Sequence, residues 1–338
     1  MLQFKNTTPF AGTILLLPDP DGIDSIYAIV KGTFSIGDAG REIDIADAQV
    51  PITYKPEYFG EPDRSSIKVP SDLSLMKPGT DVLLMGHAHA PDGRAVTQMD
   101  VSVSVGPVRK TVRVFGDRVW RTGAGAAISR PAAFDTMPLI WERAFGGVAP
   151  VENAGEVWAE ARNPVGVGFH EGRENGPADE SWLPNLEDPA NLISSWRHQP
   201  PPACFAPLAP HWEPRRAYAG TYDETWQQER APYLPDDFDP LFFQLAPVEL
   251  ISADHLTGGE LVDVSGASRD GALRFRLPIV DLAISYQIGR TTETRTPVLD
   301  TILIEPDEAR LQLVWRAVLP CDKRALQVKH VSAALVGR

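Results

Sequence analysis

Strict alternation of apolar and polar residues is the feature that most limits how this chain can fold. Val101, Val103 and Val105 alternate with serines, and Val112 and Val114 flank an arginine. Successive side chains of a β-strand point to opposite faces, so a period of two predicts strands with one buried face. The same period recurs later in two groups, Leu273, Phe275 and Leu277, and Leu311, Leu313 and Trp315. Sheet is therefore expected at both ends of the chain.

Three earlier segments also have the composition of strands. Residues 13–17, 25–36 and 81–85 are β-branched or apolar and are bounded by Pro, Asp and Gly. Apolar residues at a sustained spacing of 3.6 are hard to find, so helices should be few and short. We predict a mainly β protein, an antiparallel β-sandwich or barrel-like core with long irregular loops rich in Pro and Trp.

The chain divides by composition into three regions of one unit, residues 1–338. Residues 1–125 and 248–338 are rich in strands, whereas residues 126–247 are dense in Pro, Trp, Asn and Gly and show little periodicity. Disordered segments are poor in aromatic residues, which favours ordered, packed loops here. Six of the eight tryptophans lie in this middle segment: Trp141, Trp158, Trp182, Trp196, Trp212 and Trp226. They belong either to the core or to a binding surface with aromatic anchors.

The net charge limits the classes of binding partner that this chain can have, and its cysteine content indicates the cellular compartment. The formal net charge is -13, which would repel the phosphates of a nucleic acid or an anionic membrane. No stretch approaches the length of a membrane span, and the first residues lack the pattern of a secretory signal. The chain has only two cysteines, Cys204 and Cys321, outside any CxxC pair. We expect a cytoplasmic protein that binds neither nucleic acid nor membrane.

A search for catalytic and metal-binding patterns gives only weak signals. His87 and His89 would lie on one face of a strand, as two metal ligands do, but a third ligand is required. Carboxylates are dense nearby, and Asp72 and Asp81 are expected to brace turns rather than act in catalysis. The full set of these carboxylates is Glu57, Glu61, Asp63, Asp72 and Asp81. No nucleophile elbow, phosphate loop or dinucleotide fingerprint is present, so no catalytic residue, cofactor site or metal site is assigned.

Two short segments have the composition of turns beside strands. Pro78 and Gly79 favour a type II turn, in which Gly79 takes a positive φ. Arg118 is expected to pair with a buried carboxylate, and the alternative is that Arg118 and Trp120 are exposed anchors of an interface.

A series of short motifs in a fixed order carries a resemblance along most of the chain. They are Asn6-x-Thr8-Pro9-Phe10, Ser65-Ser66, Ser71-Asp72-Leu73, Lys77-Pro-Gly-Thr-Asp-Val82, Gly86-x-Ala88, Gly116-Asp-Arg-x-Trp120, Met137-Pro-Leu139, Glu142-Arg-Ala-Phe-Gly-Gly147, Asn163-Pro164, Leu183-Pro-Asn185, Ala219-Gly-Thr-Tyr-Asp223 with Trp226, Leu234-Pro-x-Asp-Phe-Asp239 and Gly258-Gly-Glu260. Together they resemble a bacterial family of unknown function that is encoded beside the VgrG and PAAR spike proteins of type VI secretion systems. Residues 247–254 depart from the polar stretch that the resemblance implies.

The resemblance implies a non-enzymatic adaptor or chaperone. Such a protein would bind a type VI secretion effector, or the PAAR-type tip domain of the effector, and assist its loading onto the VgrG spike. Binding could use β-augmentation or an aromatic groove, with the middle segment as the client surface and the two ends as the scaffold. Two alternatives remain: a metal-dependent hydrolase that uses His87, His89 and loop carboxylates, and a carbohydrate-binding β module that uses tryptophan faces.

Overall fold

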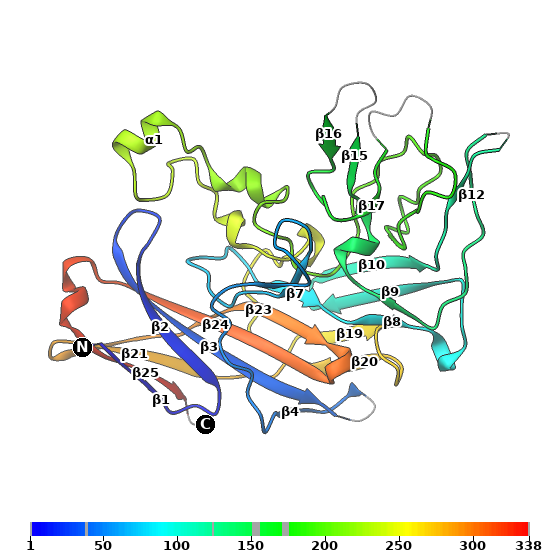
Figure 1. Ribbon diagram of the computed structural model, residues 1–338. Coiled ribbons are helices and arrows are strands. Elements are labelled where there is room, and N and C mark those ends of the chain that lie inside the picture. The colour runs from blue at the N-terminus through cyan, green and yellow to red at the C-terminus, as the bar shows by residue number, and fades with distance from the viewer. Residues whose placement is uncertain (1, 38–39, 124, 151–155, 171–175, 337–338) are drawn as a thin grey trace.

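Strands from both ends of the chain share one mixed sheet of six strands. The computed structural model describes residues 2–37, 40–123, 125–150, 156–170 and 176–336. The sheet runs in the order β2 (Ala11–Pro18), β3 (Asp24–Ile36), β24 (Arg310–Pro320), β23 (Val298–Glu305) and β7 (Asp81–Leu84), and β4 (Ile43–Ile45) also pairs with β3. The pairing of β23 with β7 is parallel, and the others are antiparallel. The N- and C-terminal regions are therefore parts of a single scaffold (Figure 1).

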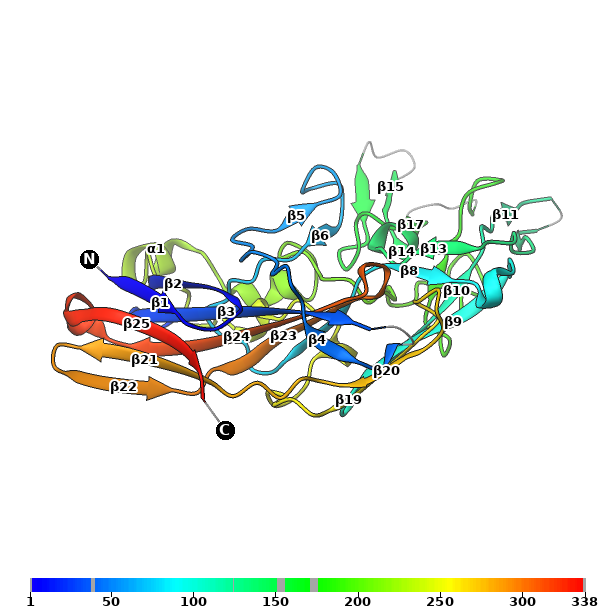
Figure 2. The ribbon, with the colours of Figure 1, turned by 90° about the horizontal axis from the view of Figure 1, so that it is seen from below.

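Two further sheets extend this scaffold. One has the order β18 (Leu186–Glu187), β10 (Val108–Phe115), β9 (Gln98–Val105), β19 (Leu261–Ser265) and β20 (Leu273–Arg276). The other has the order β1 (Gln3–Asn6), β25 (Val328–Leu335), β21 (Leu282–Ile288) and β22 (Thr291–Arg295). Figure 2 shows these two sheets toward opposite ends of the molecule.

Burial along the strands follows the alternation in the sequence. In β9, Val101, Val103 and Val105 are buried, and the serines between them are half-buried. The strand β24 differs, because nearly all of it is buried on both faces. Two of its polar side chains are buried with partners: Arg316 contacts Asp300, and Gln312 contacts Glu305. A period of two therefore finds a strand but does not reveal that a central strand is covered on both sides.

The middle segment consists of short ladders and single helical turns. Its own paired strands are β14 (Phe145–Gly146) with β17 (Val167–Gly168), and β15 (Val148–Pro150) with β16 (Val157–Ala159). Two more of its strands, β12 (Ala127–Ile128) and β13 (Thr136–Pro138), pair with β11 (Trp120–Arg121) and β8 (His87–His89) of the first region. Its helices are η3 (Trp141–Arg143), η4 (Arg215–Ala219), α1 (Glu224–Glu229) and η5 (Pro240–Phe243). In Figure 1 the green middle segment lies along one side of the strands. Elsewhere the structure has β5 (Glu57–Tyr58) with β6 (Ile67–Val69), and η2 (Pro91–Gly93), η6 (Val248–Leu250), η7 (Pro306–Glu308) and η8 (Asp322–Gln327).

The prediction of a mainly β protein with few, short helices is confirmed. The α-helix α1 has only six residues, and the remaining helical pieces are 3-10 turns. The strands form several separate sheets, so the sandwich or barrel arrangement stays a prediction. The main core joins all three regions of the chain, since Val30, Trp212 and Leu313 belong to the same cluster. Parts of the middle segment are therefore packed in the main core, as predicted.

Two predictions made from local motifs are wrong. Gly79 has no positive φ, so the Pro78-Gly79 turn is not of type II. Glycine is required there for space, because a Cβ would lie 1.7 Å from the carbonyl oxygen of Ser252. The suggestion of exposed anchors is also wrong, because Arg118 and Trp120 are both buried.

Arg118 instead forms the buried ion pair that was expected of it. Its guanidinium contacts the carboxylate of Glu187, and it also donates to the carbonyl oxygen of Pro184. The glycines of the two Gly-Gly pairs, at 146–147 and 258–259, all have positive φ, a conformation that glycine adopts without steric cost.

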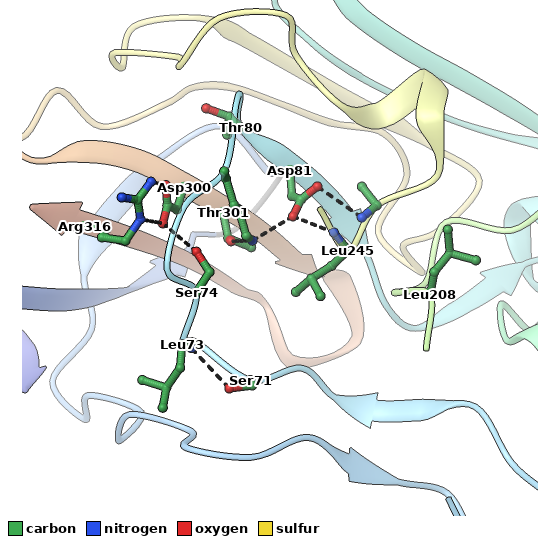
Figure 3. A network of polar contacts seen from close by, with 12 residues as sticks. Ser71, Leu73, Ser74, Thr80, Asp81, Leu208, Leu245, Asp300, Thr301 and Arg316 are labelled. Carbon is green, nitrogen blue, oxygen red and sulfur yellow. Dashed lines mark hydrogen bonds and ion pairs between the residues drawn. The ribbon is translucent and has the colours of Figure 1, made fainter. Parts of the chain in front are cut away.

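A buried ion pair joins three segments at the edge of the six-stranded sheet. Lys77 Nζ lies 2.7 Å from Asp81 Oδ2, and it also donates to Thr301 Oγ1 at 2.7 Å. The Asp81 carboxylate accepts the backbone N–H groups of Leu245 at 2.9 Å and Ala246 at 3.1 Å (Figure 3). A buried charge is tolerated only when it is paired and hydrogen-bonded, and this one holds β7, β23 and residues 245–246 together.

Replacing Asp81 by Asn should destabilise the fold strongly. The change leaves the buried ammonium group of Lys77 without its counter-charge, so we expect a loss of about 3 kcal/mol in the free energy of unfolding. Urea unfolding followed by circular dichroism measures this loss. Arg113→Ala is the matched control, because Arg113 and Asp100 form an exposed pair and should contribute less than about 1 kcal/mol. Equal losses in the two variants would contradict the assignment.

Candidate functional site

An apolar groove opens where the middle segment meets the scaffold. It encloses about 360 Å³, and its lining comes from β10, η3, η6 and the loops around residues 201 and 214. The lining side chains are Lys110, Trp141, Arg162, Pro201, Pro202, Leu208, Glu213, Pro214, Pro247, Val248 and Glu249. Most of the lining is apolar, which suits the side chains of a binding partner.

The position of Trp141 in the lining is fixed by its neighbours. Its indole N–H donates to the carbonyl oxygens of Ala206 and Pro207, at 3.1 Å each. Its ring contacts the fully buried ring of Trp212 edge to face, with centroids 6.1 Å apart. Because the indole is held at both its polar and its apolar edges, this part of the groove is formed before any partner binds.

Proline side chains build much of the remaining wall. Pro201 and Pro202 follow one another in the chain, and Pro214 and Pro247 come from separate loops. Proline has a fixed φ and no N–H group, so it presents a rigid apolar surface without an unsatisfied donor. Val248 is three-quarters exposed beside them, at 75 %. An exposed aliphatic side chain next to rigid apolar walls is typical of a binding surface.

Two ion pairs lie at the groove. Lys110 Nζ contacts Glu249 Oε1 at 2.8 Å, and Arg162 contacts both oxygens of Glu160 at 2.7 and 2.6 Å. Burial alone would raise the pKa of Glu249, but the hydrogen bond and charge of Lys110 outweigh it and leave this pKa below its usual value. The remaining charged side chain of the lining, Glu213, contacts Arg216 Nη2 at 2.9 Å, so each charged lining residue has a partner of opposite charge.

Arg215 anchors the chain beneath this surface. It is buried in η4, and it donates to the carbonyl oxygens of Phe242 at 2.9 Å and Leu208 at 2.5 Å. Burial lowers the pKa of Arg215 to about 10, partly offset by the charge of Asp81. The guanidinium therefore remains protonated at neutral pH and ties Leu208, which lines the groove, to η5.

The six tryptophans of the middle segment differ in how far their side chains are buried. Trp141 and Trp212 are buried in the main core, which confirms the core alternative for these two. Trp158 and Trp182 are exposed, and Trp196 and Trp226 are half-buried. Only Trp141 lines the groove.

The two histidines share a face of β8, as the sequence predicts. His87 Nδ1 lies 2.8 Å from Asp307 Oδ2, and His89 Nε2 lies 2.6 Å from Asp307 Oδ1. Asp307 belongs to η7, in the turn between β23 and β24. Gly86 permits this approach, since a Cβ there would lie 2.9 Å from the Asp307 carboxylate. A polar cleft of about 570 Å³ opens beside the cluster.

None of the five carboxylates singled out in the sequence lines this cleft. Glu57, Glu61 and Asp63 are exposed. Asp72 accepts hydrogen bonds from Lys31 Nζ at 2.9 Å and from the Thr53 N–H at 2.6 Å. Asp72 and Asp81 therefore brace loops, as predicted. Within the described ranges, no group of three His, Cys, Asp or Glu residues is arranged to hold a metal ion.

The two cysteines are free and buried. Burial raises the pKa of the Cys204 thiol to about 12, so this sulfur stays protonated at neutral pH and is a poor nucleophile. Among the helices that the structure describes, none has the length and apolar character required to cross a bilayer.

Sequence reasoning missed Asp307 and most of the groove. Asp307 lies 218 residues from His89, and no spacing rule connects the two positions. The groove residues Pro201 and Pro202 were visible as part of a proline run, and Pro247 and Val248 lie where the chain departs from the resemblance. Those two sequence features lie in segments that line the groove, but neither feature indicates that the segments lie side by side in the fold.

The His87, Asp307 and His89 cluster should give a pH-dependent contribution to stability. Burial acts to raise the pKa of Asp307, but hydrogen bonds from both imidazoles outweigh it and leave the pKa below its usual value. A lowered pKa stabilises the fold above the unfolded-state pKa, near 4, and this stability is lost as pH falls through the folded-state pKa. Asp307→Asn should therefore destabilise the protein by about 1 kcal/mol near pH 6, and the difference should shrink as the pH falls below about 4 and through the folded-state pKa.

Urea unfolding at a series of pH values measures this difference. Asp270→Asn is the control, because Asp270 is an exposed carboxylate that lines the same cleft. A difference that persists unchanged at low pH would show that Asp307 acts by packing rather than by charge.

Comparison with known proteins identifies the family but not an activity. Neither a curated protein nor a solved structure matches the chain. Residues 21–316 match a family described as an uncharacterized protein conserved in bacteria (DUF2169). Because this match covers most of the chain, the protein belongs to that bacterial family.

Proposed function

We propose that this protein is a non-enzymatic adaptor or chaperone of a type VI secretion system. In this proposal it binds an effector, or the PAAR-type tip domain of the effector, in the cytoplasm and assists its loading onto the VgrG spike. The apolar groove beside Trp141 is the observation that carries the proposal. The resemblance described above supplies the identity of the partner.

The groove has the properties of a site for a protein side chain. Its walls are apolar and rigid, and ion pairs lie beside them, which is the general arrangement of a protein interface with an apolar centre and a polar rim. Rigid walls lower the entropy that is lost when a partner binds. A volume of about 360 Å³ suits a few side chains of a docked segment rather than a whole domain.

The placement of the groove agrees with the division between scaffold and client surface. Trp141, Pro201, Pro202, Leu208 and Pro214 come from the middle segment. The rest of the lining includes residues of the strand-rich regions, Lys110 of β10 and residues 248–249. Residues 247–254 are where the sequence departs from the family pattern, so the lining there is the part of the site best suited to select a particular client.

Co-expression with the toxin encoded nearest to the gene is the test. We expect the two proteins to elute together in size-exclusion chromatography and the toxin to lose solubility without its partner. Val248→Asp should reduce co-elution by about tenfold, because it places a charge in the apolar lining. Val157→Asp is the matched control, since Val157 is exposed in β16 at 65 % and lies outside the groove.

Either of two results would count against the proposal. Separate peaks with an independently soluble toxin would show that this toxin is not the partner. Equal effects of the two aspartate variants would show that the groove is not the binding site. The His87, Asp307 and His89 cluster then becomes the next site to examine, by metal analysis of the purified protein and hydrolase screening. Glycan binding without turnover would instead support a carbohydrate-binding module.

A further inference from the structure

One edge of the six-stranded sheet is open to another strand. β2 is the outer strand at this edge, and β3 is its hydrogen-bonded neighbour. Among the described residues, the backbone of residues 11–18 forms no hydrogen bond to a partner other than β3. Alternate N–H and C=O groups of an edge strand point away from the sheet, so they are available to a second chain.

The side chains of β2 leave this edge unguarded. The strand reads Ala-Gly-Thr-Ile-Leu-Leu-Leu-Pro and contains no charged residue. Leu16 and Leu17 are exposed at 46 % and 40 %. Proteins normally protect an exposed edge with charged residues, prolines, bulges or a covering segment.

Three other edges of these sheets are protected. β22 carries Glu293 and Arg295, and β20 carries Arg274 and Arg276. At the far edge of the six-stranded sheet, β7 is covered by a bridge from Asp81 to Ile251 and by a hydrogen bond from the Leu84 N–H to Phe205. The apolar character of β2 is thus a local feature rather than a general property of these sheets.

The open part is the second half of the strand. Near its start, Tyr54 donates a hydrogen bond to Thr13, and Phe4 and Asn6 pack against Gly12. Beyond Ile14, exposure increases, and residues 16–18 are all exposed. The strand ends at Pro18, which limits how far an added strand can pair along it.

An acidic lobe borders the open end of β2. This lobe, residues 219–239, carries six carboxylates and a single basic residue, Arg230. It contacts the turn between β2 and β3, since Arg230 Nη2 donates to the Pro20 carbonyl at 3.1 Å and Tyr233 lies against Gly22. Figure 1 shows α1 of this lobe above the β2–β3 hairpin.

We propose that the open edge of β2 binds an extended apolar segment of another protein, with Lys or Arg residues at the end that lies near the acidic lobe. The unpaired backbone groups select a strand, and the exposed leucines select apolar side chains. The acidic lobe selects positive charge beside them. A second copy of this chain fits poorly, because pairing β2 with β2 would bring together two chains of net charge -13.

This inference goes beyond the groove. The groove is lined by residues 110, 141, 162, 201, 202, 208, 213, 214 and 247–249, and β2 contributes no residue to it. The two surfaces can therefore be tested separately, and a failure of one leaves the other in place.

A phage-displayed library of random peptides about 12 residues long, enough to span the open part of β2, tests the proposal on the whole protein. Selected peptides should alternate apolar residues and carry Lys or Arg at one end. Fluorescence anisotropy with the strongest peptide should show at least about tenfold weaker binding to Leu16→Lys, because lysine is a natural guard of edge strands. Thr292→Lys, on the guarded edge of β22, adds the same charge and should leave binding unchanged.

A separate variant tests the contribution of the acidic lobe to peptide binding. Glu224 and Glu229 are exposed in α1. The double change Glu224→Gln and Glu229→Gln should weaken binding at low salt by about threefold and make it less sensitive to added salt.

Four results would overturn the proposal. They are a library that yields no binder, selected peptides without the alternating pattern, equal loss of binding in Leu16→Lys and Thr292→Lys, and an unchanged affinity and salt dependence in the double glutamine variant. Sedimentation that shows a wild-type dimer, converted to monomer by Leu16→Lys, would assign the edge to a second copy instead. Val248→Asp should not affect peptide binding, which keeps this test distinct from that of the groove.

Discussion

The buried pair of Lys77 and Asp81 is the interaction on which the rest of the arrangement depends. Asp81 begins β7, and its carboxylate accepts two backbone N–H groups from the segment that leads into η6. That segment supplies Pro247, Val248 and Glu249 to the groove. A buried charge is stable only while all its ion-pair and hydrogen-bond partners are present, because the loss of one partner leaves buried polar groups unsatisfied. One ion pair inside the scaffold therefore positions a wall of the candidate binding site.

Several polar residues of the family motifs do similar work in the middle segment. Glu142 accepts hydrogen bonds from the N–H and hydroxyl groups of Ser66, at 2.7 Å each. Asn163 donates to the carbonyl oxygens of Trp141 and Phe145 at 2.8 and 2.9 Å. Loops without long strands cannot satisfy their backbone groups by themselves, so side chains supply the missing partners. These motif residues hold the turn around Trp141.

Local features of the fold were predictable from the sequence, and long-range ones were not. The alternation of Val101, Val103 and Val105 identifies β9 because a period of two depends only on neighbouring residues. The turn at Gly79 was misjudged because the glycine is required by the approach of Ser252, far along the chain. Asp307 was missed for the same reason. Residue types and spacing reveal which groups need a partner, but only the tertiary fold reveals which partner they have.

The edge strand β2 differs from the other strands in a way that the stability of the fold does not explain. A central strand such as β24 buries both faces, and even its Arg316 is buried and paired with Asp300. An edge such as β22 is polar, so it can face water without attracting another chain. β2 follows neither solution, since its exposed leucines add nothing to a buried core and its backbone lacks a second neighbour. Retaining such a strand is costly for a protein that acts alone, and it is readily explained for one that must recognise an extended segment of a partner.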